Sequence, residues 1–190
     1  MKRLIIFDLD DTLLHAERKP FDLAQLQTES FYIAVRPGIT SMLERLSPHY
    51  DFVIWSNTDR ASIDEKIADV WPKHIPLVDI FCDKNSSKRH NNGQGEHFFK
   101  EVWKVIKRHP QYTLGSVLGI EDKPETFVRN YGNVIRVSPF SGAPDRELDD
   151  LTDYLLSIAT HPNYRTLEKR HWKADLRRAR YYEDEETPNP

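Results

Sequence analysis

The sequence predicts an α/β fold with a Rossmann-like parallel sheet flanked by helices, a small flap, a short insert and no large cap domain. Two observations predict it. First, the apolar runs at 4–7 and 51–55 show little alternation, as is typical of parallel strands whose two faces are both covered. Second, helical patterns alternate with these runs, which favours right-handed crossovers between parallel strands. No stretch is long enough to form a large helical cap.

Up to residue 72 the patterns divide the chain into short alternating elements. We expect a strand at 4–7, a flap over 15–35 that ends in a strand at 31–35, a helix at 39–46, a strand at 51–55 and a helix at 59–71. In the first helix Met42, Leu43 and Leu46 recur at helical spacing. Thr58 or Asp59 is expected to cap the second helix.

The second half continues the alternation after a break. We expect a short strand within 75–82, a polar loop or insert with little core of its own at 83–96, a helix at 97–108, a strand at 114–120, one or two helical turns at 124–130, a last strand at 133–137 and a helix at 145–159. The insert is rich in Lys, Asn, Ser and Gly, a composition typical of loops. Asp145 is expected to cap the last helix.

The end of the chain differs from the rest in charge. Basic residues between Arg165 and Arg180 form a helix-like run, residues 183–186 are all acidic, and a proline-containing end follows. Charge blocks of this kind are usually solvated. We therefore expect residues 1–160 to form one domain and residues 161–190 to form a charged C-terminal helix and tail.

Composition limits the classes of function. The 190 residues suit one domain, and 27 Lys and Arg against 30 Asp and Glu give a net charge of -3, so bulk basicity does not point to nucleic acid. Cys82 is the only cysteine, which excludes a disulfide framework. The apolar run after Lys2 and Arg3 is too short for a signal peptide, and none approaches the about 18 residues of a membrane span. We expect a soluble, cytoplasmic protein without a membrane partner; the sequence does not indicate its oligomeric state.

Three carboxylates follow the first strand. In open α/β sheets ligands bind in the crevice beyond the carboxyl ends of the strands, which is where Asp8, Asp10 and Asp11 lie. Acids so close together repel one another unless a cation neutralises them. Asp8 and Asp10 would leave an extended strand on the same side. The motif therefore predicts a Mg²⁺ site with one carboxylate free for chemistry; an Asp-rich turn after a buried strand is the plainer alternative.

Two further strand ends are expected at the same edge of the sheet. Ser56 can donate its hydroxyl and a neighbouring N–H to a phosphate oxygen, although a loop cap is the commoner role of such a serine. Asp122 can complete the Mg²⁺ shell together with an Asp8 oxygen and the Asp10 backbone carbonyl. A lysine is then needed to offset phosphoryl charge.

The stretch DLDDT at 8–12 has the form DxDxT and so resembles the first motif of the haloacid dehalogenase (HAD) superfamily. That superfamily continues with a Ser or Thr after a strand, then a Lys, then a strand that ends in acids. The matching positions here are Asp8, Asp10, Thr12, Ser56, Lys100, Glu121 and Asp122. More narrowly, the chain resembles the FCP/SCP phosphatases, the NLI-interacting-factor group, in VRPG at 35–38, WSNT at 55–58, FFK at 98–100, LGIEDKP at 118–124 and NVIRVSPF at 133–140. The resemblance covers roughly residues 1–158.

The resemblance implies an HAD-like fold and a Mg²⁺-dependent phosphomonoester hydrolase that acts through an aspartyl-phosphate. Its expected substrate is a macromolecular phosphate, such as phosphoserine or phosphothreonine in protein. Asp8 would be the nucleophile, Asp10 would protonate the leaving oxygen and then activate water, and Thr12 would orient Asp10. The implied phosphate-binding residues are Ser56, Asn57 and Lys100, and the implied metal ligands are Asp8, Asp10, Glu121 and Asp122.

The lysine has two candidates on the predicted helix at 97–108. Lys100 and Lys104 both lie there, and either one alone is more often a solvated surface residue. FFKEVWKV resembles the aromatic-x-Lys helix start of the group, which favours Lys100.

This chain departs from the group in two places. The group tends to carry Asp-Asn where this chain has Glu121-Asp122, which adds negative charge at the metal. The insert between the serine and the lysine, where the group contacts its substrate, is only loosely matched. There Lys88 and Arg89 are expected to grip a second phosphate or an acidic flank, with an exposed polar loop as the equal alternative.

Other functions stay open at this point. A phosphatase for nucleic-acid 3′ ends would use the basic run and the insert to follow a phosphodiester backbone, although the net charge of -3 argues mildly against it. A small-metabolite phosphatase is a second alternative. A catalytically silent binding module, like relatives in mitochondrial import, is disfavoured because every expected catalytic position is filled.

Overall fold

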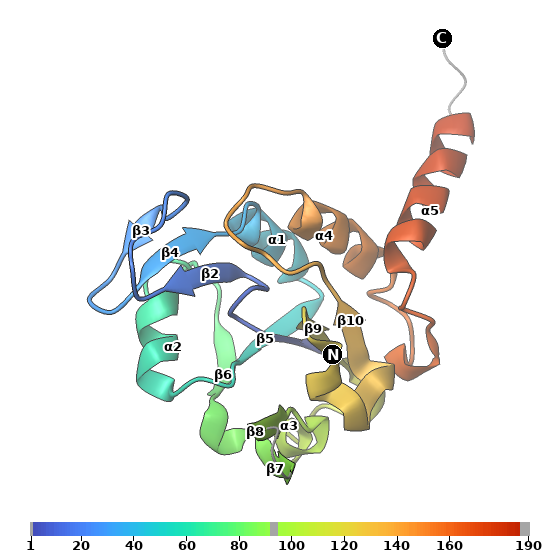
Figure 1. Cartoon of the computed structure of the whole chain (residues 1–190). Coiled ribbons are helices and arrows are strands. Elements are labelled where there is room, and N and C mark those ends of the chain that lie inside the picture. Colours follow the sequence, from blue (N-terminus) through green and yellow to red (C-terminus); the bar gives the residue numbers. More distant parts are fainter. Residues whose placement is uncertain (1, 92–94, 187–190) are drawn as a thin grey trace.

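The computed structural model describes residues 2–91 and 95–186. At its centre is a sheet in the order β10-β9-β1-β5-β6, in which every neighbouring pair is parallel (Figure 1). The strands are β1 (Arg3–Phe7), β5 (Tyr50–Trp55), β6 (Leu77–Phe81), β9 (Val117–Glu121) and β10 (Val134–Arg136). The helices are α1 (Ile39–Leu46), α2 (Arg60–Ile67), α3 (Val102–Arg108), α4 (Glu147–Ser157) and α5 (Trp172–Glu186). The predicted parallel α/β architecture is confirmed.

The central strand β1 is covered on both faces. Ile5 and Phe7 belong to a core cluster with residues of α1, α2 and α4, whereas Leu4 and Ile6 belong to a second cluster with residues of α3. All four side chains are fully buried. Neighbouring residues of a strand point to opposite faces, so a strand buried on both sides needs an unbroken apolar run.

The predicted flap is a small antiparallel sheet. Its strands lie in the order β2-β4-β3 and are β2 (Leu14–Glu17), β3 (Leu26–Gln27) and β4 (Tyr32–Val35). The turn before β4 is attached to α2, because Glu65 accepts hydrogen bonds from the Thr28 hydroxyl at 2.5 Å and from the Ser30 N–H at 2.6 Å. These contacts hold the flap beside α2 (Figure 1).

Of the two alternatives for residues 83–96, a loop or an insert with little core of its own, the structure has the insert: it holds a 3₁₀ turn and most of a strand pair, and none of its described residues belongs to the two core clusters. The predicted helix at 97–108 is wrong at its start, because residues 97–99 belong to a strand and the helix begins only with α3. The elements are the turn Asp83–Asn85 and the antiparallel strands β7 (Ser87–Asn91) and β8 (Gly95–Phe99). Lys100 therefore lies between β8 and α3, not on a helix.

Contacts distant in sequence account for this difference. In the hairpin, Lys88 pairs with Phe98 and its ammonium lies 4.9 Å from the centre of that ring, so a polar stretch gains a strand partner. The first N–H of α3, that of Val102, donates to the Asn130 side chain at 3.1 Å. A helix start capped from another segment leaves little trace in the local pattern.

Other boundaries differ less. Asp59 caps α2 by accepting a hydrogen bond from the Ser62 N–H at 3.0 Å, but α2 ends at Ile67, before the expected end. Asp145 lies just before α4, where it accepts from the Glu147 N–H at 3.1 Å. Additional 3₁₀ turns are Leu114–Ser116, Pro124–Asn133 and Tyr164–Thr166.

Residues of the charged C-terminal stretch contact the core. Tyr164, Trp172 and Leu176 belong to the same buried cluster as β1, and the Trp172 indole donates to the Arg136 carbonyl at 2.8 Å. The later part of α5 extends away from the body of the molecule (Figure 1). The expected division at residue 160 stays a prediction. Within the described residues, no helix combines the length and the apolar character that a membrane crossing requires.

A buried arginine joins the segments that surround the carboxyl edge of the sheet. The Arg36 guanidinium donates to the Asp145 carboxylate at 2.7 Å, to the Thr12 carbonyl at 2.9 Å and to the Ser138 carbonyl at 2.9 Å. Its side chain is fully buried. One residue thus connects the end of the flap, the loop after β1, the loop after β10 and the start of α4.

We expect Arg36→Met to lower the free energy of unfolding by about 3 kcal/mol, because it leaves buried acceptors unpaired. Arg45→Met is the matched control, since Arg45 pairs with Asp153 on the surface and such pairs contribute about 1 kcal/mol or less. Urea unfolding of both variants measures the difference. Equal losses would contradict the role given to Arg36.

Candidate functional site

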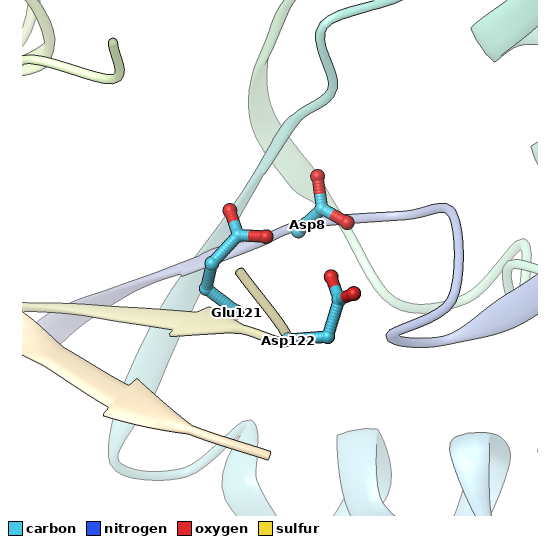
Figure 2. Close-up of side chains that lie close together, drawn as sticks. All are labelled: Asp8, Glu121 and Asp122. Carbon is cyan, nitrogen blue, oxygen red and sulfur yellow. The ribbon is translucent and has the colours of Figure 1, made fainter. Parts of the chain in front are cut away.

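Three carboxylates from two neighbouring strands face a common space (Figure 2). Asp8 directly follows β1, Glu121 ends β9, and Asp122 comes next. Because β1 and β9 pair side by side, their carboxyl ends bring the three residues together. One oxygen of each lies within 4.8 Å of the others, and all three residues are buried. The structure thus assembles three of the four acids predicted as metal ligands.

A buried lysine lies between two of these acids. Lys100 Nζ contacts Asp8 Oδ1 and lies 2.6 Å from Glu121 Oε2. Lys104 is directed elsewhere and donates to the Asn85 carbonyl and the Ser87 hydroxyl, each at 2.8 Å. Of the two candidates, Lys100 is therefore the one beside the acids.

The burial of these groups changes their pKa values. Burial and the Glu121 carboxylate raise the pKa of Asp8 to about 8, although Lys100 opposes this shift. Burial likewise raises the pKa of Glu121. Burial alone would lower the pKa of Lys100, but Asp8 and Glu121 outweigh burial and hold it above its ordinary value. When all three acids are ionised, one buried lysine does not balance their charge, so a bound cation would favour the ionised forms.

The Asp122 carboxylate is the best evidence for a cation at this position. Its Oδ1 accepts a hydrogen bond from the Thr12 hydroxyl at 3.3 Å, but its buried Oδ2 has no hydrogen-bond partner among the described residues. It forms an ion pair with Lys123 Nζ at 3.5 Å. A buried carboxylate oxygen that lacks a hydrogen bond suits a hard divalent ion, which prefers oxygen ligands. The hydroxyl of Thr12, which was expected to orient Asp10, contacts Asp122, and its effect on Asp10 stays a prediction.

Asp10 lies apart from the acid cluster. Its Oδ1 accepts a hydrogen bond from Lys66 Nζ at 2.5 Å, and its Oδ2 accepts one from the Ser56 hydroxyl at 3.3 Å. Because β1 ends at Phe7, before both residues, the alternation of an extended strand does not fix where the Asp8 and Asp10 side chains point, and their shared side stays a prediction. The Asp10 charge is one of the causes of the raised pKa of Asp8. Because both carboxylate oxygens of Asp10 already accept hydrogen bonds, its backbone carbonyl is the group that could contact a metal ion.

The loop after β5 carries the predicted phosphate-binding serine. The Ser56 hydroxyl reaches both Asp10 and the Thr58 hydroxyl, the latter at 3.1 Å. Asn57 was expected to bind substrate, but its Oδ1 accepts a hydrogen bond from the Ser86 hydroxyl at 2.6 Å. Its side chain thus fixes the loop to the segment that precedes β7.

The two basic residues predicted to contact the substrate are neighbours on β7. Successive side chains on a strand point to opposite faces, so Lys88 and Arg89 do not form one grip. Lys88 lies over the Phe98 ring, and both Lys88 and Arg89 are exposed. The hairpin that carries them leads directly into Lys100.

Sequence reasoning missed one residue that contacts the predicted site. Lys66 on α2 is buried, with a side chain 5% exposed, and it pairs with Asp10. A signal was present, because Lys66 lies three residues after Ile63 and next to Ile67, two apolar residues whose spacing indicates the inward face of the helix. A lysine on an inward helical face needs a buried acid as its partner.

Comparison with known proteins identifies similar chains. A family model described as NLI interacting factor-like phosphatase matches residues 3–165. Over 181 residues the chain is 29% identical to the ubiquitin-like domain-containing CTD phosphatase 1 of Drosophila melanogaster, covering 90% of this chain and 54% of that protein. Over 167 residues it is 28% identical to the mitochondrial import inner membrane translocase subunit TIM50 of Phytophthora infestans, covering 85% and 36%. The chain thus spans about half the length, or less, of these relatives.

A solved structure has the same fold. The RNA polymerase II CTD phosphatase Fcp1 of fission yeast superposes with a TM-score of 0.55 at 18% identity, covering 97% of this chain and 65% of that one. At 18% sequence identity, this similarity supports a shared fold and nothing further. The HAD-like fold expected from the sequence is confirmed.

We expect added Mg²⁺ to raise the melting temperature of the wild-type protein, because a ligand that binds only the folded state stabilises that state. At a ligand concentration of one hundred times the dissociation constant, the free energy of unfolding rises by about 2.7 kcal/mol. Asp122→Asn should lose this shift, since it removes a charged oxygen from the cluster. Asp64→Asn, on the exposed side of α2, is the matched control and should keep it. Thermal melts with and without Mg²⁺ measure the effect, and equal shifts in wild type and Asp122→Asn would place the ion elsewhere.

Proposed function

The chain belongs to the NLI interacting factor-like phosphatase family, and on this premise we propose that it is a Mg²⁺-dependent phosphomonoester hydrolase. The proposed reaction passes through an aspartyl-phosphate on Asp8. The observation that carries the proposal is the convergence at one edge of the sheet of Asp8, Lys100 and an Asp122 oxygen that lacks a hydrogen bond. A nucleophile, a fixed positive charge and a cation site are what phosphoryl transfer requires.

In the first step an Asp8 carboxylate oxygen attacks phosphorus. A bond forms between Asp8 and phosphorus, and the bond from phosphorus to the ester oxygen breaks. Asp10, which lies next to Ser56, gives its proton to the departing oxygen. Lys100 and the Ser56 hydroxyl neutralise the phosphoryl oxygens, whose charge must be stabilised in the transition state.

In the second step water hydrolyses the aspartyl-phosphate. Asp10 now accepts a proton from the attacking water, the bond from phosphorus to Asp8 breaks, and inorganic phosphate leaves. Asp8 and Asp122 would hold Mg²⁺, because both oxygens of Glu121 already accept hydrogen bonds. Oε2 accepts from Lys100 and Thr126, and Oε1 accepts from the Lys123 N–H. Bound there, the ion would supply positive charge to the phosphoryl group.

The proposed substrate is a phosphorylated protein. Two features support this choice. Relatives of the chain are named as CTD phosphatases, and the flap consists of three short strands, which suits a phosphate presented on a macromolecule. Phosphorylated nucleic-acid ends and small metabolites are the rival substrates. A cytoplasmic location stays a prediction, and the chain is also similar to a protein named for mitochondrial import.

Asp8→Asn tests the chemistry. We expect its turnover of 4-nitrophenyl phosphate to fall to background, because an amide cannot form the aspartyl-phosphate. Asp11→Asn is the matched control, since Asp11 is a neighbouring acid outside the cluster and asparagine tolerates its φ of 62°. Retained Mg²⁺-dependent turnover in Asp8→Asn would rule out Asp8 as the nucleophile.

Charge reversal on β7 tests the substrate class. Because the two side chains point to opposite faces, we expect only one of the single variants Lys88→Glu and Arg89→Glu to raise the KM for a phosphoserine peptide, by several-fold, while both spare 4-nitrophenyl phosphate. Steady-state kinetics on both substrates, with a 3′-phosphorylated oligonucleotide alongside, measure this. Unchanged peptide KM values in both variants would exclude β7 from recognition, and preference for the oligonucleotide would favour the nucleic-acid alternative.

A further inference from the structure

Lys66 occupies an unusual position for a lysine. It lies on α2, its side chain is 5% exposed, and its ammonium is 4.7 Å from the centre of the Phe31 ring of the flap. Burying an ammonium is costly unless it finds an acid. Its acid is Asp10, whose Oδ1 lies 2.5 Å from Lys66 Nζ.

The contact leaves the two oxygens of Asp10 in different surroundings. Oδ1 is held by Lys66, whereas Oδ2 faces the Ser56 hydroxyl at 3.3 Å. Ser56 directly follows β5, which pairs with β1 in the sheet, so Oδ2 is directed toward the edge where Asp8 lies. The charge-assisted hydrogen bond from Lys66 to Oδ1 is the stronger of the two contacts, and together with the Ser56 contact to Oδ2 it restricts the rotation of the Asp10 carboxylate.

We propose that Lys66 is a positioning residue that holds Asp10 by Oδ1 and thereby keeps Oδ2 aimed at the leaving oxygen of the substrate. This inference rests on the proposed function, because it takes Asp10 as the group that gives and later accepts the proton. Among the described residues, the Lys66 ammonium hydrogen-bonds to Asp10 and not to Asp8. Its effect lies in the orientation of Asp10 before the proton moves.

The flap encloses this contact. Glu65, the preceding residue on α2, holds the flap turn through Thr28 and Ser30, and Phe31 of the same turn covers the Lys66 ammonium. The effect of a loosened flap can therefore be measured separately from the effect of losing the contact between Lys66 and Asp10. Glu65→Gln weakens the attachment of the flap and leaves the Lys66 ammonium in place.

The proton step gives Lys66 a recognisable kinetic signature. As the bond from phosphorus to the ester oxygen breaks, the proton on Asp10 Oδ2 moves to that oxygen. An alkyl oxygen such as that of serine needs this proton, whereas an activated phenolate leaves without it. Misdirection of Asp10 therefore lowers kcat/KM for a phosphoserine ester and spares kcat/KM for an activated aryl ester.

The experiment compares kcat/KM of Lys66→Met, Lys66→Arg and Glu65→Gln on a phosphoserine peptide and on 2,4-dinitrophenyl phosphate, each with Mg²⁺. General acid catalysis contributes about 10²–10⁴-fold, so we expect Lys66→Met to lose about tenfold or more on the peptide and little on the aryl ester. Lys66→Arg should recover part of the loss, because arginine keeps the charge. Glu65→Gln should not change the ratio between the two substrates.

Two results would overturn the proposal: an equal loss on both substrates, which is what a purely structural role produces, or no loss in Lys66→Met on the peptide. If Lys66→Met does not fold, Lys66→Gln replaces it with the same expectations. The proposed function is decided separately by Asp8→Asn on the aryl ester. Activity that survives in Asp8→Asn rejects the reaction, whereas an unchanged substrate ratio in the Lys66 variants rejects only the role of Lys66.

Discussion

The Lys100 ammonium, held between Asp8 and Glu121, is the interaction on which the candidate site depends. A carboxylate as deeply buried as Asp8 is costly in its charged form, and a lysine as deeply buried as Lys100 is costly as well. Each group makes the burial of the other tolerable. The backbone contributes too, because the Lys100 N–H donates to the Thr126 carbonyl at 2.8 Å and fixes the residue between β8 and α3.

The two sides of this edge are connected through Thr12. Its carbonyl accepts a hydrogen bond from the buried Arg36, and its hydroxyl donates one to Asp122. Arg36 in turn binds Asp145 before α4. The position of the acid cluster is therefore coupled to the flap and to the packing of α4, although neither supplies an acid to the cluster.

Sequence patterns predicted the parts of the site that a strand delivers. The apolar run of β1 placed Asp8 at the edge of the sheet, and the run before Glu121 did the same for the second strand, because burial on both faces leaves an unmistakable pattern. The hairpin and Lys66 were not predicted, since each depends on a partner distant in the chain. The cross-strand contact of Lys88 with Phe98 and the pairing of Lys66 with Asp10 have no local periodicity.

The connection of β8 to Lys100 bears on how such a site can diversify. The hairpin begins after Asn85 and ends before Lys100, and both points are fixed by contacts to other segments: Lys104 donates to the Asn85 carbonyl, and the Lys100 N–H donates to the Thr126 carbonyl. Residues inserted between β7 and β8 would lengthen the hairpin without displacing the two points at which it is fixed. The length of this hairpin can thus vary, and with it the surface offered to large ligands, while the residues at the edge of the sheet keep their positions.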